Sequence, residues 1–533
     1  MRKKIAFPPL VSKSEQAGAF LALIFTAAVF LPLLRMFAGL DVTGFRRVLA
    51  DPGLQQALRN SLLTALPATA ITVTAAFLLS LCVHRTGIPG KGIFGILFVL
   101  PMLLPSISHG MGLILLLGNN GILTRLFGWR GSIYGMPGIL LGSVLYAFPV
   151  AWLMLGDVLA YEDGAAHQAA RVLGVSRFRA FTTLTLTFLR RPLRSTCFTV
   201  FAMIVTDYGV PLMVGGKYTT LAVVMYQEVI GRLDFGKGAV CGALLLLPAV
   251  AAFLLDLNNR DKGRLAQVSE SFPLLTGRSV QTVAFLCCVV VSVLVLLPPV
   301  AFLLQAFAAD YPADLTPTLA HLARTFRLRG GVYYGNSLLI SLGTAFIGTA
   351  VAFLTAYLST RMHSRLSRFL HLSALTTAAI PGMVLGLSYV LVFRNTPFYG
   401  TIALLILVNM VHFIASPYLM ICHALSKTDE NLEGVAHTLG IRRGLLIRHV
   451  LIPHCKSTLL EMFSYFFVNS MMTISAVSFL ATTQNKPLSL MINQFEAQMQ
   501  LECAAVVSLL ILLTNLTVKG TAHFLRCKKG EKR

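Results

Sequence analysis

The chain has 533 residues, of which 56% are hydrophobic and 12% charged, and its mean hydropathy is +0.75. Soluble domains carry roughly 45–50% apolar and about 25% charged residues, so this composition excludes an ordinary soluble protein and indicates a chain largely surrounded by lipid. The net charge of +23 does not indicate a nucleic-acid partner, because Lys and Arg lie mainly in alternate loops between apolar runs, and no loop is long enough for a binding module.

Apolar runs of about 20 residues predict twelve membrane spans. Their approximate limits are 17–40, 61–84, 92–118, 135–160, 196–214, 237–257, 280–307, 336–360, 370–394, 400–424, 458–481 and 501–520. The first run is long enough to span and is followed by no clear cleavage site, so we expect an uncleaved helix rather than a signal peptide. The fifth run is short and contains Asp207, Gly209 and Pro211, which predicts a broken span.

The distribution of basic residues predicts the orientation. With the N-terminus in the cytoplasm, 29 Lys and Arg residues fall on the cytoplasmic side and 14 on the outer side. Cytoplasmic loops are the ones enriched in Lys and Arg. We therefore expect a multi-pass protein of the cell membrane, with membrane lipid around it and both termini in the cytoplasm.

An internal repeat divides the chain. Asn60-Ser-Leu-Leu recurs as Asn336-Ser-Leu-Leu and Arg85 recurs as Arg361, both at an offset of 276, while Leu173-Gly recurs as Leu439-Gly at an offset of 266. Each copy has six spans, so both copies insert in the same direction and form a parallel repeat. The sequence predicts a first unit at 1–258, a cytoplasmic linker at 259–279 and a second unit at 280–533.

No catalytic or cofactor-binding pattern is present. The nine cysteines form no CxxC pair, and neither HExxH nor G-x-S-x-G occurs. The nearest approach to a phosphate-binding loop, Gly215-Gly-Lys-Tyr, lacks the leading glycine and the Ser or Thr after lysine. We expect no enzyme activity, no cofactor and no metal site, and any ATP that drives this protein must bind to another chain.

The longest loop of each unit, at 162–194 and 426–456, predicts a short amphipathic helix. In the first loop Ala166, Ala169, Ala170 and Leu173 follow helical spacing, and Leu432, Val435, Ala436 and Leu439 do the same in the second. The spacing places Gly174 and Gly440 where a left-handed residue ends a helix. Asp429 is positioned to cap the second helix, and Ser176 to cap the helix that follows the first.

These two loops resemble the EAA loops of bacterial ATP-binding-cassette importer permeases, whose pattern is Glu-Ala-Ala, three residues, Gly, nine residues and Ile-x-Leu-Pro. The match has departures: Gln168 and Gly434 stand at the Glu position, and the second copy carries Glu433 one residue earlier. In that family the loop helix docks on the ATPase subunit. The resemblance therefore implies an ATPase-coupling role for Gln168, Ala169, Ala170, Gly174, Glu433, Ala436, Gly440 and Pro453.

Two further segments resemble permeases of the ferric-iron type, which include 2-aminoethylphosphonate relatives. They are 206–216, followed by Tyr226-Gln-Glu-Val-Ile-Gly, and 472–480. The resemblance implies the type I importer fold, all-α with about twelve spans in two six-helix repeats. It also implies two ATPase copies, an extracytoplasmic solute-binding protein and alternating access. The expected translocation path contains Asp207, Tyr208, Gly209, Pro211, Thr473 and Ser475.

Asp207 has two interpretations. A carboxylate inside a span usually faces a cavity or a partner, which favours a place on the path. Alternatively, Asp207 satisfies backbone groups freed by Gly209 and Pro211. His109 and His412 also lie in spans, where polar helix–helix contacts explain them better than metal binding does, because neither has another ligand at suitable spacing.

Two rival functions remain from the sequence. An ion-coupled secondary transporter also has twelve spans, but it should carry more intramembrane acids and bases than this chain does. An integral-membrane enzyme is disfavoured by the missing catalytic residues. For the substrate, ferric iron is the first expectation, with 2-aminoethylphosphonate, thiamine and polyamine as alternatives.

Overall fold

The computed structural model describes residues 10–530, apart from 41, 129–130, 161, 260–271, 273, 275–276, 363 and 430. The expected linker at 259–279 and both chain ends lie mainly outside the described residues. In the first half the elements are α1 (Leu10–Phe25), η1 (Thr26–Phe30), α2 (Leu31–Ala38), α3 (Val42–Leu49), α4 (Pro52–Arg85), α5 (Lys91–Val99), η2 (Leu100–Leu103), α6 (Ser106–Leu117), α7 (Ile122–Phe127), α8 (Met136–Ala160), α9 (Ala165–Val172), α10 (Arg177–Ala180), η3 (Phe181–Thr185), α11 (Leu186–Val205), α12 (Gly209–Val214), α13 (Leu221–Tyr226), η4 (Gln227–Gly231) and α14 (Phe235–Asn259).

The second half is also almost entirely helical. Its elements are α15 (Arg278–Phe307), β1 (Ala308–Asp310), β2 (Asp314–Pro317), α16 (Ala320–Thr325), η5 (Phe326–Gly330), α17 (Gly331–Arg361), α18 (Arg365–Thr376), η6 (Thr377–Ala379), α19 (Gly382–Phe393), α20 (Ile402–Phe413), α21 (Ala415–Leu425), α22 (Asn431–Thr438), α23 (Arg443–Leu446), η7 (Ile447–Leu451), α24 (Ile452–His454), α25 (Lys456–Met472), α26 (Ser489–Ala497) and α27 (Leu501–Gly530). Strands β1 and β2 form one antiparallel hairpin. The expected all-α membrane fold is confirmed.

Among the described residues, eight helices are long and apolar enough to cross a membrane, or ten if each of two bent helix pairs is one span. The bent pairs are α18–α19, with a 110° bend, and α20–α21, with a 57° bend. The expected spans 196–214 and 458–481 are helical over most of their length but fail these criteria. In the first, α11 carries a basic stretch just before residue 196, and in the second, α25 is only 17 residues long.

The spans break at equivalent points in the two halves. Helices α6 and α19 each begin just after a proline, Pro105 or Pro381, which lie 276 positions apart, as the repeat requires. Helix α11 ends at Val205, so the expected break near Asp207 is confirmed. Helix α25 ends at Met472, and the expectation of a continuous helix through 458–481 is wrong beyond that residue.

Side chains at the start of α4 and α17 make the same contacts in both halves. Asn60 donates a hydrogen bond to Thr219 O (3.0 Å), and Asn336 donates one to Gln484 O (2.9 Å). The neighbouring hydroxyls, Ser61 and Ser337, accept bonds of 2.8 and 2.7 Å from backbone amides at the start of α13 and beside α26. The repeat seen in the sequence is therefore also a repeat of hydrogen bonds.

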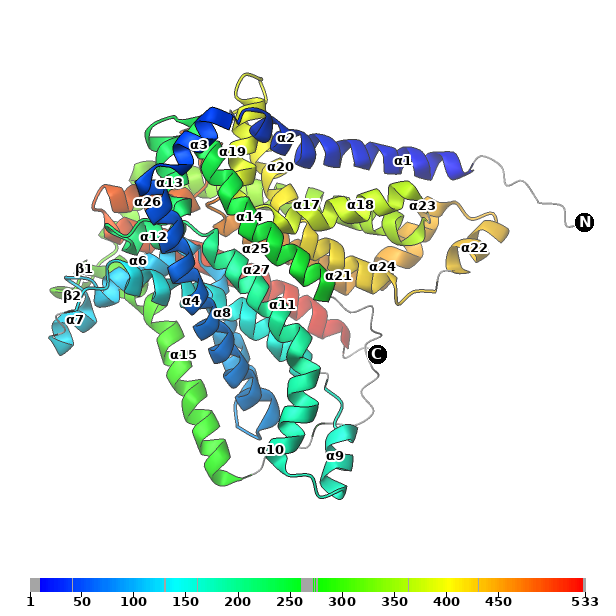
Figure 1. Cartoon of the computed structure of the whole chain (residues 1–533), viewed down its shortest axis with the longest axis horizontal. Coiled ribbons are helices and arrows are strands. Elements are labelled where there is room, and N and C mark those ends of the chain that lie inside the picture. The colour runs from blue at the N-terminus through cyan, green and yellow to red at the C-terminus, as the bar shows by residue number, and fades with distance from the viewer. Residues whose placement is uncertain are drawn as a thin grey trace, which may run out of the picture.

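The first span of each half packs on the other half. Helix α1 contacts α18 and α17, and α2 contacts α19, while α15 contacts α4, α5 and α6. Figure 1 shows this exchange, with α1 beside α18 along the upper edge and α15 beside α4 at the lower edge. A hydrogen bond of 2.7 Å from the Tyr389 hydroxyl to Ala28 O joins α19 to η1 across the exchange. The two halves are thus interlocked rather than placed side by side.

Candidate functional site

Helix α9 ends as its sequence predicts. Gly174 adopts a left-handed φ of +70°, its N–H bonds to Arg171 O (3.1 Å), and the Val175 N–H bonds to Ala170 O (2.9 Å). These two bonds form a Schellman motif, which requires a residue that tolerates positive φ. Ser176 then caps α10 by accepting a hydrogen bond from Arg179 N.

Helix α22 has the same design in the second half. Gly440 has a φ of +68°, and the Ile441 N–H bonds to Ala436 O at 2.8 Å. At the other end of the helix, the Asp429 carboxylate accepts a bond of 2.9 Å from Asn431 N, as expected of a capping residue. Figure 1 places α9 and α22 toward one side of the molecule, and α7 and the β1–β2 hairpin at the opposite end.

The two helices leave apolar side chains exposed. Leu173 is 79% exposed and its repeat partner Leu439 is 68% exposed. Of the eight residues expected to couple to an ATPase, Gln168, Ala169, Gly174, Gly440 and Pro453 are exposed, Ala170 and Glu433 are half-buried, and Ala436 is buried. Exposed apolar side chains at equivalent points of both halves are typical of a surface that another protein covers. Ala170, Glu433 and Ala436 are thus less accessible to a partner than the five exposed residues of this set.

Asp207 lies in the break between α11 and α12. Its carboxylate accepts hydrogen bonds from Val210 N (3.0 Å) and Gly209 N (3.3 Å), and the Ser106 side chain also bonds to it. The carboxylate therefore satisfies backbone groups freed by the break, as one of the two interpretations expected. Asp207 also lines a small cavity together with hydroxyl groups, which belong to Ser61, Thr64, Ser143 and Thr220.

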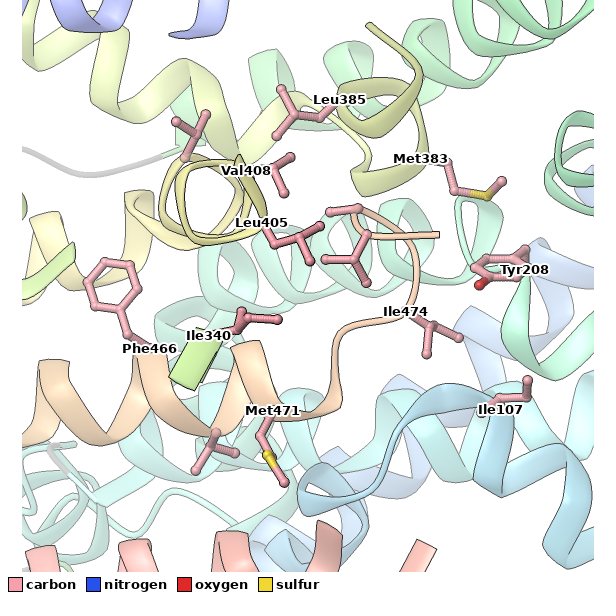
Figure 2. Close-up of a cluster of buried hydrophobic side chains, with 14 of the residues drawn as sticks. Ile107, Tyr208, Ile340, Met383, Leu385, Leu405, Val408, Phe466, Met471 and Ile474 are labelled. Atoms are coloured by element: carbon pink, nitrogen blue, oxygen red, sulfur yellow. The ribbon is translucent and has the colours of Figure 1, made fainter. Parts of the chain in front are cut away.

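Aromatic rings gather next to Asp207, where the two halves meet. Tyr208 stacks on Tyr226 with ring centroids 5.0 Å apart, and Tyr226 stacks on Phe479 of the second half at 6.4 Å. The Tyr208 and Ser478 hydroxyls lie 2.5 Å apart, and Asn493 donates a bond of 3.0 Å to the Tyr226 hydroxyl. Figure 2 shows Tyr208 near Ile474, on the segment that follows α25.

A serine and a glycine exchange places between the halves. A Cβ added to Gly209 would lie 2.3 Å from Ser106 Oγ, and a Cβ added to Gly382 would lie 2.3 Å from Ser475 Oγ. Ser106 and Gly382 are equivalent in the repeat, and so are Gly209 and Ser475. Each half therefore has room for one hydroxymethyl group at this point. The other path residues, Pro211 and Thr473, are buried beside it.

The Tyr226–Gly231 motif also forms an ion-pair cluster. The Glu228 carboxylate lies 2.8 Å from Arg232 and 3.0 Å from Lys237. Lys237 is also 3.0 Å from Asp51, the N-cap of α4, and this hydrogen bond lowers the pKa of Asp51 below its usual range. The cluster joins the start of α4 to the start of α14.

The sequence did not predict several residues of the contact between the two halves beside Asp207. Ser478, Phe479 and Asn493 lie opposite Tyr208 and Tyr226 only because of how the chain folds, and no spacing in the sequence indicates it. The sequence shows Arg85 and Arg361 only as a repeated pair. Their shared offset was a usable signal, because a buried arginine that recurs at the same point of a repeat must have a partner in both halves. No group of three or more metal-ligating side chains occurs among the described residues.

A parallel repeat of broken spans, with one exposed loop helix in each half, defines the permease of an ATP-binding-cassette importer. The chain matches the family of binding-protein-dependent transport system inner membrane components over residues 345–526. It is therefore a multi-pass transport protein of the inner membrane rather than a catalytic enzyme. Permeases of this class work with an ATPase and a substrate-binding protein. This assignment replaces the ion-coupled transporter that the sequence left open.

Relatives match both halves of the chain. A putative ferric transport system permease protein of Haemophilus influenzae is 25% identical over 466 residues, which are 83% of this chain and 72% of the relative. The ferric transport system permease protein of Actinobacillus pleuropneumoniae is 24% identical over 463 residues, 83% of this chain and 66% of the relative. A thiamine transport system permease protein of Escherichia coli is 22% identical over 484 residues, or 87% of each chain.

We expect Gly440→Val to weaken ATPase association several-fold, because a left-handed backbone costs an ordinary residue about 1–2 kcal/mol and the helix end would shift. Gly174→Val should act in the same direction with a smaller effect. Co-purification of the ATPase with each variant measures the change. Gly444→Val is the matched control: no atom lies within 4 Å of an added Cβ at either Gly440 or Gly444, but Gly444 has no positive φ. Equal losses in Gly440→Val and Gly444→Val would contradict the prediction.

Proposed function

We propose that the chain forms the membrane path of an importer whose ATP is bound and hydrolysed on separate chains. Two ATPase copies dock on α9 and α22, and their closure moves both helices so that the path opens alternately to each side. The observation that carries this proposal is the pair of loop helices with left-handed glycine ends and exposed Leu173 and Leu439. A single unpaired helix would be an ordinary surface helix, whereas two at equivalent points suit two identical partners.

We also propose that α9, α22 and both chain termini lie in the cytoplasm. The excess of Lys and Arg in the loops on that side supports this orientation. In Figure 1 the start of α1 lies toward the same side as α22. In this orientation the units 1–258 and 280–533 are joined by a cytoplasmic linker at 259–279, and α7 and the β1–β2 hairpin face outward.

Cysteine labelling tests this orientation. On a cysteine-free background, Ser176→Cys and Thr438→Cys should be protected from a membrane-impermeant thiol reagent applied from outside, while Asn119→Cys should react. All three positions should react once the membrane is opened with detergent, which controls for exposure. Labelling of Ser176→Cys or Thr438→Cys in sealed cells would contradict both the orientation and the docking role.

We propose that Asp207, Tyr208, Gly209, Pro211, Thr473 and Ser475 line the path where the halves meet. Support comes from the break in both spans and from the hydrogen bond between Tyr208 and Ser478, which joins the halves at this point. The Asp207 carboxylate keeps the backbone of the break satisfied while facing a polar cavity. In the closed state, interactions of this kind join the two halves across the path. In the open state, these interactions are broken.

We expect Tyr208→Phe to raise basal ATP hydrolysis by about 2–10-fold, because the lost hydrogen bond is worth about 0.5–1.5 kcal/mol to the state in which the halves are joined. The reconstituted complex provides the rate. Tyr389→Phe is the matched control, since it also removes a buried hydroxyl that bonds across the halves, to Ala28 O, but lies outside the proposed path. Equal hydrolysis rates in the two variants would argue against a path role for Tyr208.

Ferric iron is the substrate we propose first. The two ferric relatives support it, and so does a centre with one carboxylate and two phenols, which are oxygen groups suited to a hard cation. Thiamine is the second candidate, because a relative transports it and because the stack of Tyr208, Tyr226 and Phe479 suits a planar aromatic cation.

Uptake into proteoliposomes decides between these substrates. The chain is reconstituted with its ATPase and its binding protein, and radioactive ferric iron and radioactive thiamine are offered in parallel with ATP inside. We expect ATP-dependent accumulation of iron and none of thiamine. The purified chain alone should hydrolyse no ATP. Accumulation of thiamine instead would overturn the iron proposal, and hydrolysis by the chain alone would overturn the separation of path and ATPase.

A further inference from the structure

Two arginines lie at the C-terminal ends of helices that are equivalent in the repeat. Both are at the side of the molecule where the loop helices lie. Arg85 is the last residue of α4, and Arg361 is the last residue of α17. Only 7% of each side chain is exposed. A buried guanidinium carries a charge and five N–H donors, and leaving it without a counter-charge and acceptors costs free energy. The partners of these two arginines therefore show what each half holds together at this point.

In the second half Arg361 joins three segments. Its Nη2 donates hydrogen bonds to Leu425 O (3.2 Å) and Thr428 O (3.1 Å), which end α21 and begin the loop. Its Nε lies 3.3 Å from the carboxylate of Glu433 on α22. One side chain thus connects the last turn of α17, the end of α21 and the loop helix.

In the first half Arg85 joins the same three segments. Its Nη2 donates to Leu159 O (3.0 Å), which is equivalent to Leu425 in the repeat, and to the Glu162 carboxylate. The second oxygen of Glu162 lies 3.0 Å from His167 Nε2 on α9, and it also accepts a bond of 3.0 Å from Thr185 at the start of α11. His167 and Glu433 are equivalent positions of the two loop helices. The first half therefore reaches its loop helix through a carboxylate and an imidazole, whereas the second half uses a direct ion pair.

The aromatic ring of Phe272 covers the first of these contacts. The ring centroid lies 3.6 Å from the Arg85 guanidinium carbon and 4.5 Å from the His167 ring. Such a ring adds cation–π attraction and excludes water from the ion pair. It strengthens the one contact that depends on an intermediate carboxylate.

We propose that Arg85 and Arg361 are positioning residues that fix each loop helix to the membrane-spanning helices, so that movement of the ATPase reaches the path. This inference rests on the proposed docking of the ATPase on α9 and α22. It also gives Glu433 a new role: the carboxylate faces Arg361 within the chain instead of the ATPase. Loss of these contacts would remove the ion pairs that tie the short loop helices to α4 and α17, so the loop helices could move without moving those spans.

A double-mutant cycle on the second half tests the proposal. Arg361→Gln and Glu433→Gln should each lower substrate uptake per ATP hydrolysed by about 5-fold or more, at equal amounts of bound ATPase. The double variant should be no worse than Arg361→Gln alone, because both substitutions remove one shared contact. Arg361→Lys should recover part of the loss, since it keeps the charge without the planar fork. Arg368→Gln, an exposed arginine on α18, is the matched control and should behave as the wild type does.

A second measurement separates this proposal from the docking on which it rests. Spin labels at Thr438 on α22 and Arg365 on α18, both exposed, report the distance between the loop helix and the spans without any ATPase present. The distance distribution should broaden in Arg361→Gln and Glu433→Gln and stay narrow in Arg368→Gln. Unchanged distributions, or losses of coupling that add up in the double variant, would overturn the positioning role. Failure of the wild-type chain to bind ATPase would overturn the docking proposal. The spin-label result would still support or contradict the positioning role of Arg361.

Discussion

Hydrocarbon offers no hydrogen bonds, so every backbone group released where a span breaks must find a partner inside the protein. The fold depends on how those groups are satisfied. Asp207 accepts from Val210 N, Ser61 accepts from Leu221 N, and the Ser489 hydroxyl donates to Thr473 O at 2.7 Å. Because polar side chains are available at these points, the chain can leave the helical path in mid-membrane and bring short segments of both halves together.

Close packing supplies the second condition for these breaks. An added Cβ at Gly110 would lie 3.2 Å from Val210 O, and one at Gly386 would lie 2.6 Å from Ala476 O, so each broken segment rests against a glycine of an earlier span in the same half. Membrane helices rely on such small residues, because lipid provides no hydrophobic force that drives helices together. The repeat preserves this contact while other side chains differ between the halves. At the centre of this molecule, the close contact between backbone segments is therefore kept in both halves, whereas the identity of the surrounding side chains is not.

Much of this arrangement could be predicted from the sequence. Hydropathy located the spans, the recurring Asn-Ser-Leu-Leu located the repeat, and the left-handed Gly174 and Gly440 followed from the apolar spacing before them. The early end of α25 at Met472 could not be predicted, because Thr473 and Ser475 are compatible with a helix and the break is imposed by packing on α19. The pairing of Arg361 with Glu433 was equally hidden. It depends on where the loop helix lies against α17, and that is a property of tertiary structure alone.

The exchange of first spans between the halves has a consequence for the order in which the protein is made. Helices α1 and α2 enter the membrane well before their partners α18 and α19, which follow about 340 residues later. At roughly 5–20 residues per second, a ribosome needs about 17–68 s to synthesise that length. During this interval the first span has only lipid around its future contact surface. Its hydropathy of 2.4 keeps it inserted in the bilayer while it waits, so its sequence must satisfy two successive surroundings, first lipid and then protein.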